Sequence, residues 1–246
     1  MLAAVILAAG KGKRMKNPER AKVMFEVNGK PMIDYVVSLA LSVHSDRIVI
    51  IVGHQKQSVI DLIRSDFHQY RDRITFAHQD VQLGTGHAVM QTEPVLKDFT
   101  GEVLILSGDV PLLSKNTVDE FIEFHKTGNF DASLISAFFD NPAGYGRIIR
   151  DDSGKFIDII EHKDSTDEQK KVKEINSGIY LINNKYLFEA LKTINADNAQ
   201  QEYYLTDVFY YFRNKGMKIG AMPVKNNLEI TGVNSVEQLS QLEKLI

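Results

Sequence analysis

The sequence predicts an α/β fold: a doubly wound, mainly parallel sheet in the first half and an antiparallel extension in the second. Short apolar runs rich in Val and Ile alternate with helical patterns over about residues 1–110. These runs are apolar without alternation, as expected for strands that are covered on both faces. In the second half, neighbouring runs are instead joined by turn residues, which is typical of antiparallel pairs. Ligands of doubly wound sheets bind beyond the carboxyl ends of the strands, so polar residues there are the first candidates for function.

Strands and helices are expected to alternate through the first half. Each predicted helix repeats apolar side chains at helical spacing, and Pro31 suits the first turn of one of them because its φ is fixed. In chain order we expect a strand at 3–8, a helix at 31–41, a strand at 48–52, a helix at 56–65, a strand at 73–79, a helix at 86–96 and a strand at 102–109. This order is typical of a parallel sheet with helices on both faces.

The second half is expected to contain antiparallel strands and two further helices. The turn 151–154, with sequence DDSG, separates two β-rich runs and predicts a hairpin. The aromatic stretch 202–212 is interpreted as a helix that faces the core. In chain order the expected elements are strands at 131–139, 146–150, 155–163 and 174–182, and helices at 202–212 and 235–246. No linker, low-complexity tract or repeat divides the chain, which predicts a single domain over 1–246.

The composition excludes several classes of function. With 43% hydrophobic residues, 25% charged residues and a net charge of -3, the chain lacks the positive charge of nucleic-acid binders. The absence of Cys excludes disulfides, thiolate metal sites and a cysteine nucleophile, and the seven His show no HExxH spacing. The N-terminal apolar run is too short for a signal peptide or a spanning helix. We therefore expect a cytoplasmic protein with no nucleic-acid or membrane partner, and a monomer or weak homo-oligomer.

The segment LAAGKGKRM, residues 7–15, follows the first predicted strand and combines two glycines with three cations. A glycine-rich loop at a strand end is suited to binding phosphate through its backbone. The dinucleotide fingerprint requires a third glycine where the chain has Met15, which argues against a Rossmann dehydrogenase. The P-loop requires Ser or Thr where Arg14 follows Lys13. The segment is therefore either another kind of phosphate loop or a surface turn with solvated cations.

The segment LILSGDVPLL places Asp109 at the end of a buried strand. An aspartate there can serve as a turn or helix-capping residue. The same position also suits Mg²⁺, which prefers oxygen ligands and takes few of them from protein when phosphate and water supply the rest. Together with Arg14 and Lys22, Asp109 forms a set that is typical of phosphoryl or nucleotidyl transfer, in which positioning and charge neutralisation dominate catalysis.

Nine segments in order along the chain resemble those of bacterial N-acetylglucosamine-1-phosphate uridylyltransferases. They are LAAGKGKRM, AKVMFEVNGKPM, QLGTGHAV, SGDVPLL, NPAGYGRIIR, IIEHKDSTDEQ, EINSGIYL, NAQQEYYLTDV and EITGVNS. The resemblance covers nearly the whole chain, and other sugar-nucleotide pyrophosphorylases normally have GGxGTRL in the loop. It implies a GT-A-like nucleotidyltransferase fold, in agreement with the alternation of strands and helices. It also implies a nucleotide-binding half at about 1–110 and a sugar-phosphate-binding half at about 111–246.

The resemblance implies Mg²⁺-dependent transfer of UMP from UTP to N-acetylglucosamine 1-phosphate. In that family the glycine loop binds the nucleotide, the matching cations hold the triphosphate, and the residues that match Gln79, Gly84 and Thr85 recognise uracil. Carried over to this sequence, the catalytic residues are Arg14, Lys22 and Asp109, and the metal ligands are Asp109 and Asn234. The nucleotide-binding residues are Leu7, Ala8, Ala9, Gly10, Arg14, Lys22, Gln79, Gly84, Thr85, Ser107 and Gly108. The sugar-phosphate residues are Gly146, Glu161, Asn176, Tyr204 and Thr206, whereas His162 and Lys163 are expected to be solvated.

Three departures from the family pattern are visible. Ala21 stands where proline usually precedes the phosphate-binding lysine, and Ser107 stands where tyrosine is often found. No hexapeptide repeats of a left-handed β-helix follow, so we expect no acetyltransferase activity. Two other hypotheses stay open: transfer to another sugar 1-phosphate, and a regulatory module that binds nucleotide sugars without turnover. Lys22, Asp109 and Asn234 are all present, and this favours an enzyme.

Overall fold

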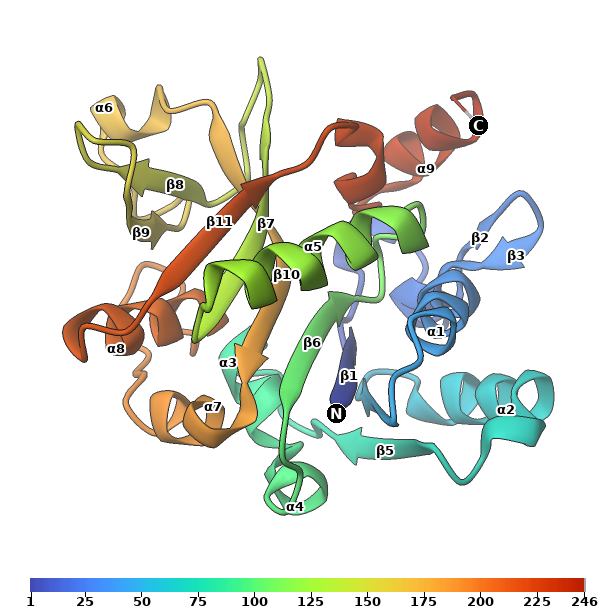
Figure 1. Ribbon diagram of the computed structural model, residues 1–246. Coiled ribbons are helices and arrows are strands. Elements are labelled where there is room, and N and C mark those ends of the chain that lie inside the picture. The colour runs from blue at the N-terminus through green and yellow to red at the C-terminus, as the bar shows by residue number, and fades with distance from the viewer. Residues whose placement is uncertain (246) are drawn as a thin grey trace.

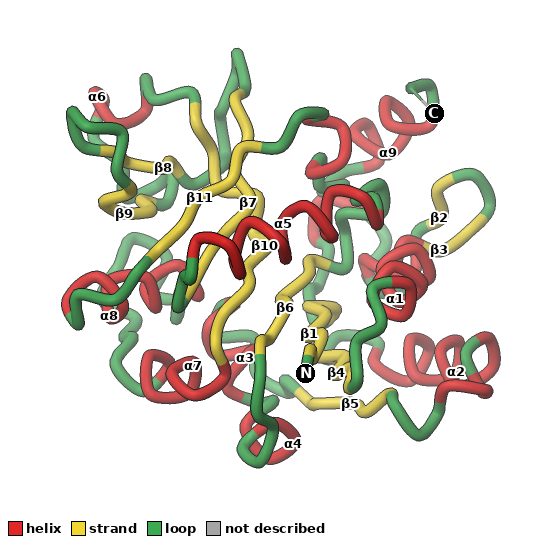
Figure 2. The backbone as a smooth tube through the Cα atoms, in the orientation of Figure 1, coloured by secondary structure: helices red, strands yellow, loops and turns green. Residues whose placement is uncertain are grey.

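The computed structural model describes residues 1–245, except for the side chain of Lys13. The first half forms the parallel part of a nine-stranded sheet, in which the strands run side by side in the order β6-β1-β4-β5 (Figures 1 and 2). The bounds of these strands are β1 Leu2–Ala8, β4 Arg47–Val52, β5 Ile74–His78 and β6 Glu102–Ser107. Each expected strand of this half is present, and the parallel pairing confirms the predicted fold class.

The second half extends the same sheet beyond β6. The added strands are β7 Ala132–Phe138, β8 Arg147–Arg150, β9 Phe156–Ile160, β10 Glu174–Asn183 and β11 Ile219–Pro223. The strand β10 pairs antiparallel with both β6 and β7, and β11 runs parallel to β7 at the edge. The expected hairpin is formed by β8 and β9, and β8 joins it to β10. A small separate ribbon contains β2 Glu26–Val27 and β3 Lys30–Pro31.

Helices cover both faces of the sheet. One face packs against α1 Met32–Ser42, α2 Lys56–Asp66 and α5 Lys115–Gly128. The other face packs against α3 Thr85–Met90, α4 Glu93–Leu96, α7 Asn184–Leu191 and α8 Val208–Asn214. Successive residues of β1 alternate between the two cores, so that Ala4 and Ile6 face one and Ala3 and Val5 the other. This two-sided burial explains why β1 is apolar at every position. The short α6 Asp167–Lys170 and the final helix α9 Val236–Glu243 complete the described chain.

Two helix predictions need correction. The expected helix at 86–96 is divided into α3 and α4 at Gln91–Thr92, where the Thr92 hydroxyl donates to the Val89 carbonyl across 2.7 Å. The aromatic stretch at 202–212 is helical only from Leu205 onwards. Tyr203 is in a loop instead, because its backbone N–H donates to the Leu83 carbonyl and its carbonyl accepts from Gly86 N–H, both across 2.8 Å.

Other elements were absent from the sequence prediction. They include α5, which begins after the capping residue Ser114, and α7, whose cap is Asn183. No helix within residues 1–245 is both long and apolar enough to cross a membrane.

Candidate active site

A cavity of about 520 Å³ opens beyond the carboxyl ends of β1 and β6. This is the position that a doubly wound sheet predicts for a ligand. The cavity contains most residues that the sequence assigns to the nucleotide, together with several that it does not, such as Lys11, Gln82 and Glu202. The lining residues are Leu7, Ala9, Gly10, Lys11, Gly12, Lys22, Val23, Gln79, Gln82, Gly84, Thr85, Ala88, Ser107, Asp109 and Glu202.

Three of the expected nucleotide residues do not line this cavity. Ala8 is buried at the end of β1. Gly108 packs against β1, where its N–H donates to the Leu7 carbonyl across 3.0 Å. Arg14 lies on a single turn of 3₁₀ helix, Lys13–Met15, with an exposed side chain. The structure therefore brings Lys22, but not Arg14, to the wall of the cavity.

Close packing between the glycine loop and Lys22 shapes one part of the cavity wall. Gly12 has a φ of 58°, in the left-handed region that favours glycine. A Cβ atom at Gly12 would lie 2.9 Å from the Cβ atom of Lys22, closer than side chains pack. The second glycine of the loop thus lets the backbone pass directly beside Lys22.

Lys22, Asp109 and Asn234 form one polar cluster at the edge of the cavity. The Lys22 ammonium donates to Asp109 Oδ2 and, across 2.7 Å, to Asn234 Oδ1. The backbone also joins the two acceptors, since Val233 N–H donates to the Asp109 carbonyl across 2.9 Å. The side chains of Lys22 and Asp109 are only 14% and 22% exposed, so water screens their attraction weakly. A carboxylate oxygen and an amide oxygen therefore converge on one cation.

This pair of oxygens fits the ligand chemistry of Mg²⁺, which is bound by few protein oxygens when phosphate and water complete its shell. Within residues 1–245 no group of three His, Asp or Glu side chains is placed to hold a metal by itself. A metal at Asp109 and Asn234 would accordingly depend on a substrate for further ligands.

Gln79 also lines the cavity and is 4% exposed. Its amide nitrogen donates to the Gly84 carbonyl across 2.9 Å and lies 3.1 Å from His87 Nδ1. Thr85 is held there as well, because its hydroxyl accepts from Leu205 N–H across 3.1 Å. Gln79 and Thr85 are thus fixed by hydrogen bonds, and His87 is a contact that sequence reasoning missed.

Four of the expected sugar residues meet between β8, β10 and the segment after β9. The Thr206 hydroxyl donates to Glu161 Oε1 across 3.2 Å, and Asn176 N–H donates to the Gly146 carbonyl across 2.9 Å. A Cβ atom at Gly146 would lie 3.5 Å from both Glu161 Oε1 and the Cβ atom of Asn176. Because Gly146 has no side chain, the backbone comes close to both residues. Tyr204 is bonded elsewhere, since its hydroxyl donates to Asp164 across 3.1 Å.

Burial controls the ionisation of this cluster. It raises the pKa of Glu161, with a further upward contribution from Asp164 and an opposing one from the Thr206 hydrogen bond. Burial likewise raises the pKa of Tyr204 to about 12, with opposition from Gln200 and support from Asp164. Glu161 is thus a poorly solvated carboxyl group that gains from hydroxyl or amide donors.

The cavity and the cluster around Glu161 meet where β6 ends beside β10. The register of β10 against β7 shifts between Asn176 and Tyr180, and within this bulge Gly178 has a φ of 79°. The Gly178 carbonyl accepts from Ser107 Oγ across 3.4 Å, and Gly178 N–H donates to Asn176 Oδ1 across 3.2 Å. Bulges commonly redirect side chains beside active sites. Here the bulge connects Ser107 in the wall of the cavity to Asn176 in the cluster around Glu161.

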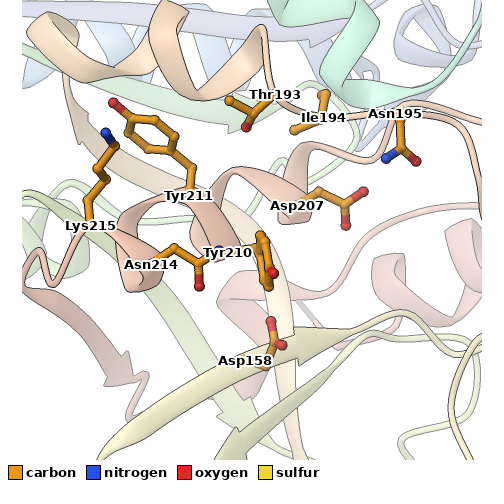
Figure 3. A pocket seen from close by; sticks show the side chains of 9 residues that line it. All are labelled: Asp158, Thr193, Ile194, Asn195, Asp207, Tyr210, Tyr211, Asn214 and Lys215. Atoms are coloured by element: carbon orange, nitrogen blue, oxygen red, sulfur yellow. The ribbon is translucent and has the colours of Figure 1, made fainter.

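A larger cavity, of about 720 Å³, lies between β9, α8 and the segment after α7 (Figure 3). It is lined by Asp158, Thr193, Ile194, Asn195, Asp207, Tyr210, Tyr211, Asn214 and Lys215. It contains none of the residues that the sequence assigns to a substrate. Asp207 is nevertheless adjacent to Thr206 in the chain, and burial, reinforced by Glu161, Asp158 and Asp164, raises its pKa to about 6.

Several curated proteins are similar to this chain over its whole length. The bifunctional protein GlmU of Caldanaerobacter subterraneus subsp. tengcongensis is 48% identical over 245 residues, which cover 100% of this chain and 51% of that protein. The bifunctional protein GlmU of Acetivibrio thermocellus is 43% identical, with the same coverage of the two chains. The chain thus spans about half the length of the curated relatives it matches.

Solved structures share the fold at low sequence identity. A UDP-glucose pyrophosphorylase in complex with UDP-glucose has a TM-score of 0.79 and 18% identity, covering 99% of this chain and 97% of the other. A protein described as a glucose-1-phosphate thymidylyltransferase from Bacillus anthracis has a TM-score of 0.76 and 19% identity, covering 100% and 95%. The family model for nucleotidyl transferases matches residues 3–229. The chain therefore belongs to the nucleotidyl transferase family.

Proposed function

We propose that this protein transfers UMP from UTP to N-acetylglucosamine 1-phosphate, forming UDP-N-acetylglucosamine and pyrophosphate. The observation that carries the proposal is the convergence of Lys22, Asp109 and Asn234 beside the nucleotide cavity. A cation and two oxygen ligands at one point suit a reaction between two polyanions. The similarity to GlmU proteins along the whole chain supports the choice of substrates.

In this reaction a phosphate oxygen of the sugar phosphate attacks the α-phosphorus of UTP in line with the leaving group. A new P–O bond forms as the bond from the α-phosphorus to its bridging oxygen breaks, and pyrophosphate departs with the electron pair. The attacking phosphate is already ionised near neutral pH, so no general base is needed. The protein contributes by positioning the reactants and neutralising charge, a role for Lys22 at the cavity wall and for Arg14 on the exposed loop.

We further propose that Asp109 and Asn234 hold Mg²⁺. Bound there, the ion would supply positive charge against the phosphates of the nucleotide. Since both oxygens face one ammonium group, they are already arranged around a cation. Lys22 would then turn its ammonium group toward phosphate oxygen, which its flexible side chain permits.

The two ends of the site account for the proposed specificity. The buried Gln79 amide and the adjoining Gly84 and Thr85 would bind uracil through hydrogen bonds, since an amide can pair with both an imide N–H and a carbonyl. At the acceptor end, Gly146, Glu161, Asn176, Tyr204 and Thr206 would bind the sugar. The close approach of the Gly146 backbone suits the acetamido group.

A pyrophosphate-release assay tests the function directly. Each of the four nucleoside triphosphates is combined with N-acetylglucosamine 1-phosphate, glucosamine 1-phosphate and glucose 1-phosphate in Mg²⁺, and the product is identified by mass spectrometry. We expect the highest kcat/KM for UTP with N-acetylglucosamine 1-phosphate. The Lys22→Met variant, which lacks the ammonium group, serves as the control for contaminating activity.

Two results would contradict the proposal. Comparable kcat/KM values for ATP and UTP would show that Gln79, Gly84 and Thr85 do not select uracil. Faster use of another sugar 1-phosphate would leave nucleotidyl transfer intact and replace the acceptor.

A further inference from the structure

Arg147 is a buried cation without an acidic partner. It is 1% exposed, and among the ion pairs of residues 1–245 none includes it. Burial lowers the pKa of its guanidinium group. By contrast, the neighbouring Arg150 on the same strand pairs with the buried Glu174, with Nε 2.6 Å from Oε2. Burying an unpaired cation is unfavourable, and an apolar side chain would fill this space without the loss of hydration.

The guanidinium group of Arg147 is bonded to two separate main-chain segments. Its Nη1 donates to the Tyr145 carbonyl, and its Nη2 donates to the Lys170 carbonyl across 3.3 Å. Its Nε has no hydrogen-bond partner in the described structure. In Figure 1, α6, which ends at Lys170, lies beside β8, which begins at Arg147. A planar group with fixed donor directions thus sets the distance between the two segments.

These two segments carry neighbouring residues of the proposed acceptor site, Gly146 and Glu161. Tyr145 directly precedes Gly146, and Lys170 ends a segment that begins with Glu161. Hydrogen bonds make this second segment compact: the Glu161 carbonyl accepts from Asp164 N–H across 3.0 Å and from Ser165 Oγ across 2.8 Å. It continues through a capping box at the start of α6. A displacement of Lys170 would therefore move the segment that holds Glu161.

We propose that Arg147 is a positioning residue of the acceptor site: its guanidinium group ties the Gly146 backbone to the Glu161 segment and so fixes the width of the sugar pocket without touching substrate. This inference rests on the proposed function, because it concerns the pocket for the sugar phosphate. The two hydrogen bonds from Arg147 to main-chain carbonyls explain why a cation is buried here, where an apolar side chain would fill the space without loss of hydration.

Two variants of Arg147 and one control test the proposal. Arg147→Met keeps most of the volume and removes all donors, whereas Arg147→Lys keeps the charge but can no longer bind both carbonyls with a planar group. The control is Arg47→Met, because Arg47 also donates to a main-chain carbonyl, that of Val95, but begins β4 at the opposite end of the sheet from the cavity. Steady-state kinetics, UTP affinity by calorimetry and Tm are measured for all of them.

For Arg147→Met we expect a rise of at least about tenfold in KM for the sugar phosphate, with UTP affinity within about twofold of wild type. Arg147→Lys should recover part of the acceptor KM. Arg47→Met is expected to lower Tm without changing the acceptor KM. The positioning role would be overturned if Arg147→Met weakened UTP binding as much as it raised the KM for the sugar phosphate. It would also be overturned if the KM for the sugar phosphate changed in proportion to Tm in every variant.

Hydrogen exchange separates this inference from the proposed function, because it needs no turnover. Arg147→Met should lose amide protection in both 141–147 and 161–172, and Arg47→Met in neither. If amide protection in 141–147 and 161–172 is unchanged, Arg147 does not hold the two segments together. This conclusion is independent of the substrate that the enzyme uses. If the wild-type protein uses no sugar 1-phosphate, the proposed function fails, and with it the acceptor role, while the exchange data still report on the tie.

Discussion

Lys22 and Asn234 are 212 positions apart in the sequence, yet the Lys22 ammonium donates to Asn234 Oδ1 across 2.7 Å. Lys22 follows the glycine loop, whereas Asn234 directly precedes the residues that lead into α9. Gln238 on that helix fixes Asn234, since its side-chain oxygen accepts from Asn234 N–H across 2.7 Å. Residues from near both ends of the described chain, Lys22 and Asn234, therefore belong to one polar cluster.

Replacement of Asp109 by Asn should lower kcat by at least about a hundredfold, the scale seen when one electrostatic contributor to a transition state is lost. The amide removes the negative charge that faces Lys22 and the proposed metal. The fold should be retained, because the side chain remains the same size. We would measure kcat over a range of Mg²⁺ concentrations, with Asp119→Asn on the exposed side of α5 as the control. A near-normal rate in Mg²⁺ would remove Asp109 from the metal site.

Replacement of Glu161 by Ala should weaken use of the sugar phosphate far more than binding of UTP. Glu161 lies in the proposed acceptor cluster and bonds to Thr206, and it does not line the cavity that contains Lys22 and Asp109.

For the wild-type protein we also expect N-acetylglucosamine 1-phosphate to be favoured over glucosamine 1-phosphate, because a pocket shaped for the acetamido group leaves polar groups unpaired without it. Acceptor kinetics and UTP affinity test both statements. Equal use of the two sugars, or a variant defective only toward UTP, would exclude Glu161 from the sugar site.

Replacement of Asp207 by Asn should change the pH dependence of stability. Burial near Glu161 raises the pKa of Asp207 from its ordinary 3.8 to about 6, so the folded protein binds more protons than the unfolded chain between these values. The free energy of unfolding therefore falls as the pH rises through this window, and the loss remains above it. The neutral Asn avoids that loss and should give a more stable protein at pH 7, by roughly 1 kcal/mol after allowance for solvent screening.

Urea unfolding at several pH values from 4 to 8 would measure this difference. The two proteins should be closest in stability near pH 4 and diverge as the pH approaches 7. Asp98→Asn, at an exposed position, is the matched control and should show no such divergence. A stability difference that is constant across the range would contradict the assignment.

Replacement of His125 by Ala should destabilise the protein by about 2–3 kcal/mol without changing kcat. His125 is 3% exposed on α5, where Nδ1 bonds to Ser133 Oγ and Nε2 lies 3.3 Å from Glu102 Oε2. In the variant, Ser133 Oγ and Glu102 Oε2 both lose their contact with the imidazole ring. Glu102 begins β6, and the active-site cluster lies beyond the other end of that strand. Chemical denaturation measures the loss of stability, and steady-state kinetics measure kcat. The control is His78→Ala, at an exposed position. A variant of His125 that loses activity at unchanged stability would contradict a purely structural role for this residue.

The parallel half of the fold follows closely from local sequence. Strands buried on both faces have no polar alternation, and the runs at 48–52 and 102–109 show this directly. The aromatic stretch at 202–212 misled the prediction because its apolar side chains suit a helix, whereas the backbone of Tyr203 is used to pair with the loop around Gly84. That choice depends on a tertiary contact, which no local pattern encodes.

The candidate site was predictable to a similar extent. The position of Asp109 at a strand end indicates a cation site, and the glycine loop indicates phosphate. Asn234 and Glu161 entered only through the resemblance to a family, because their partners are distant in the sequence. The contact of Gln79 with His87, and the tie formed by Arg147, were not anticipated at all. Both depend on side-chain directions that are set only when several elements pack together.

The bulge in β10 fixes the spacing between the cavity wall at Ser107 and the proposed sugar residue Asn176. Side chains along a strand alternate between faces, so one added residue within 177–179 would turn Asn176 away from Gly146 while β10 kept its pairing with β6. Changes in length at 139–146 or 161–173 shift no strand register. The loops that carry the proposed sugar residues can therefore vary in length, whereas the position of Asn176 relative to Gly146 depends on the hydrogen-bond register of β10.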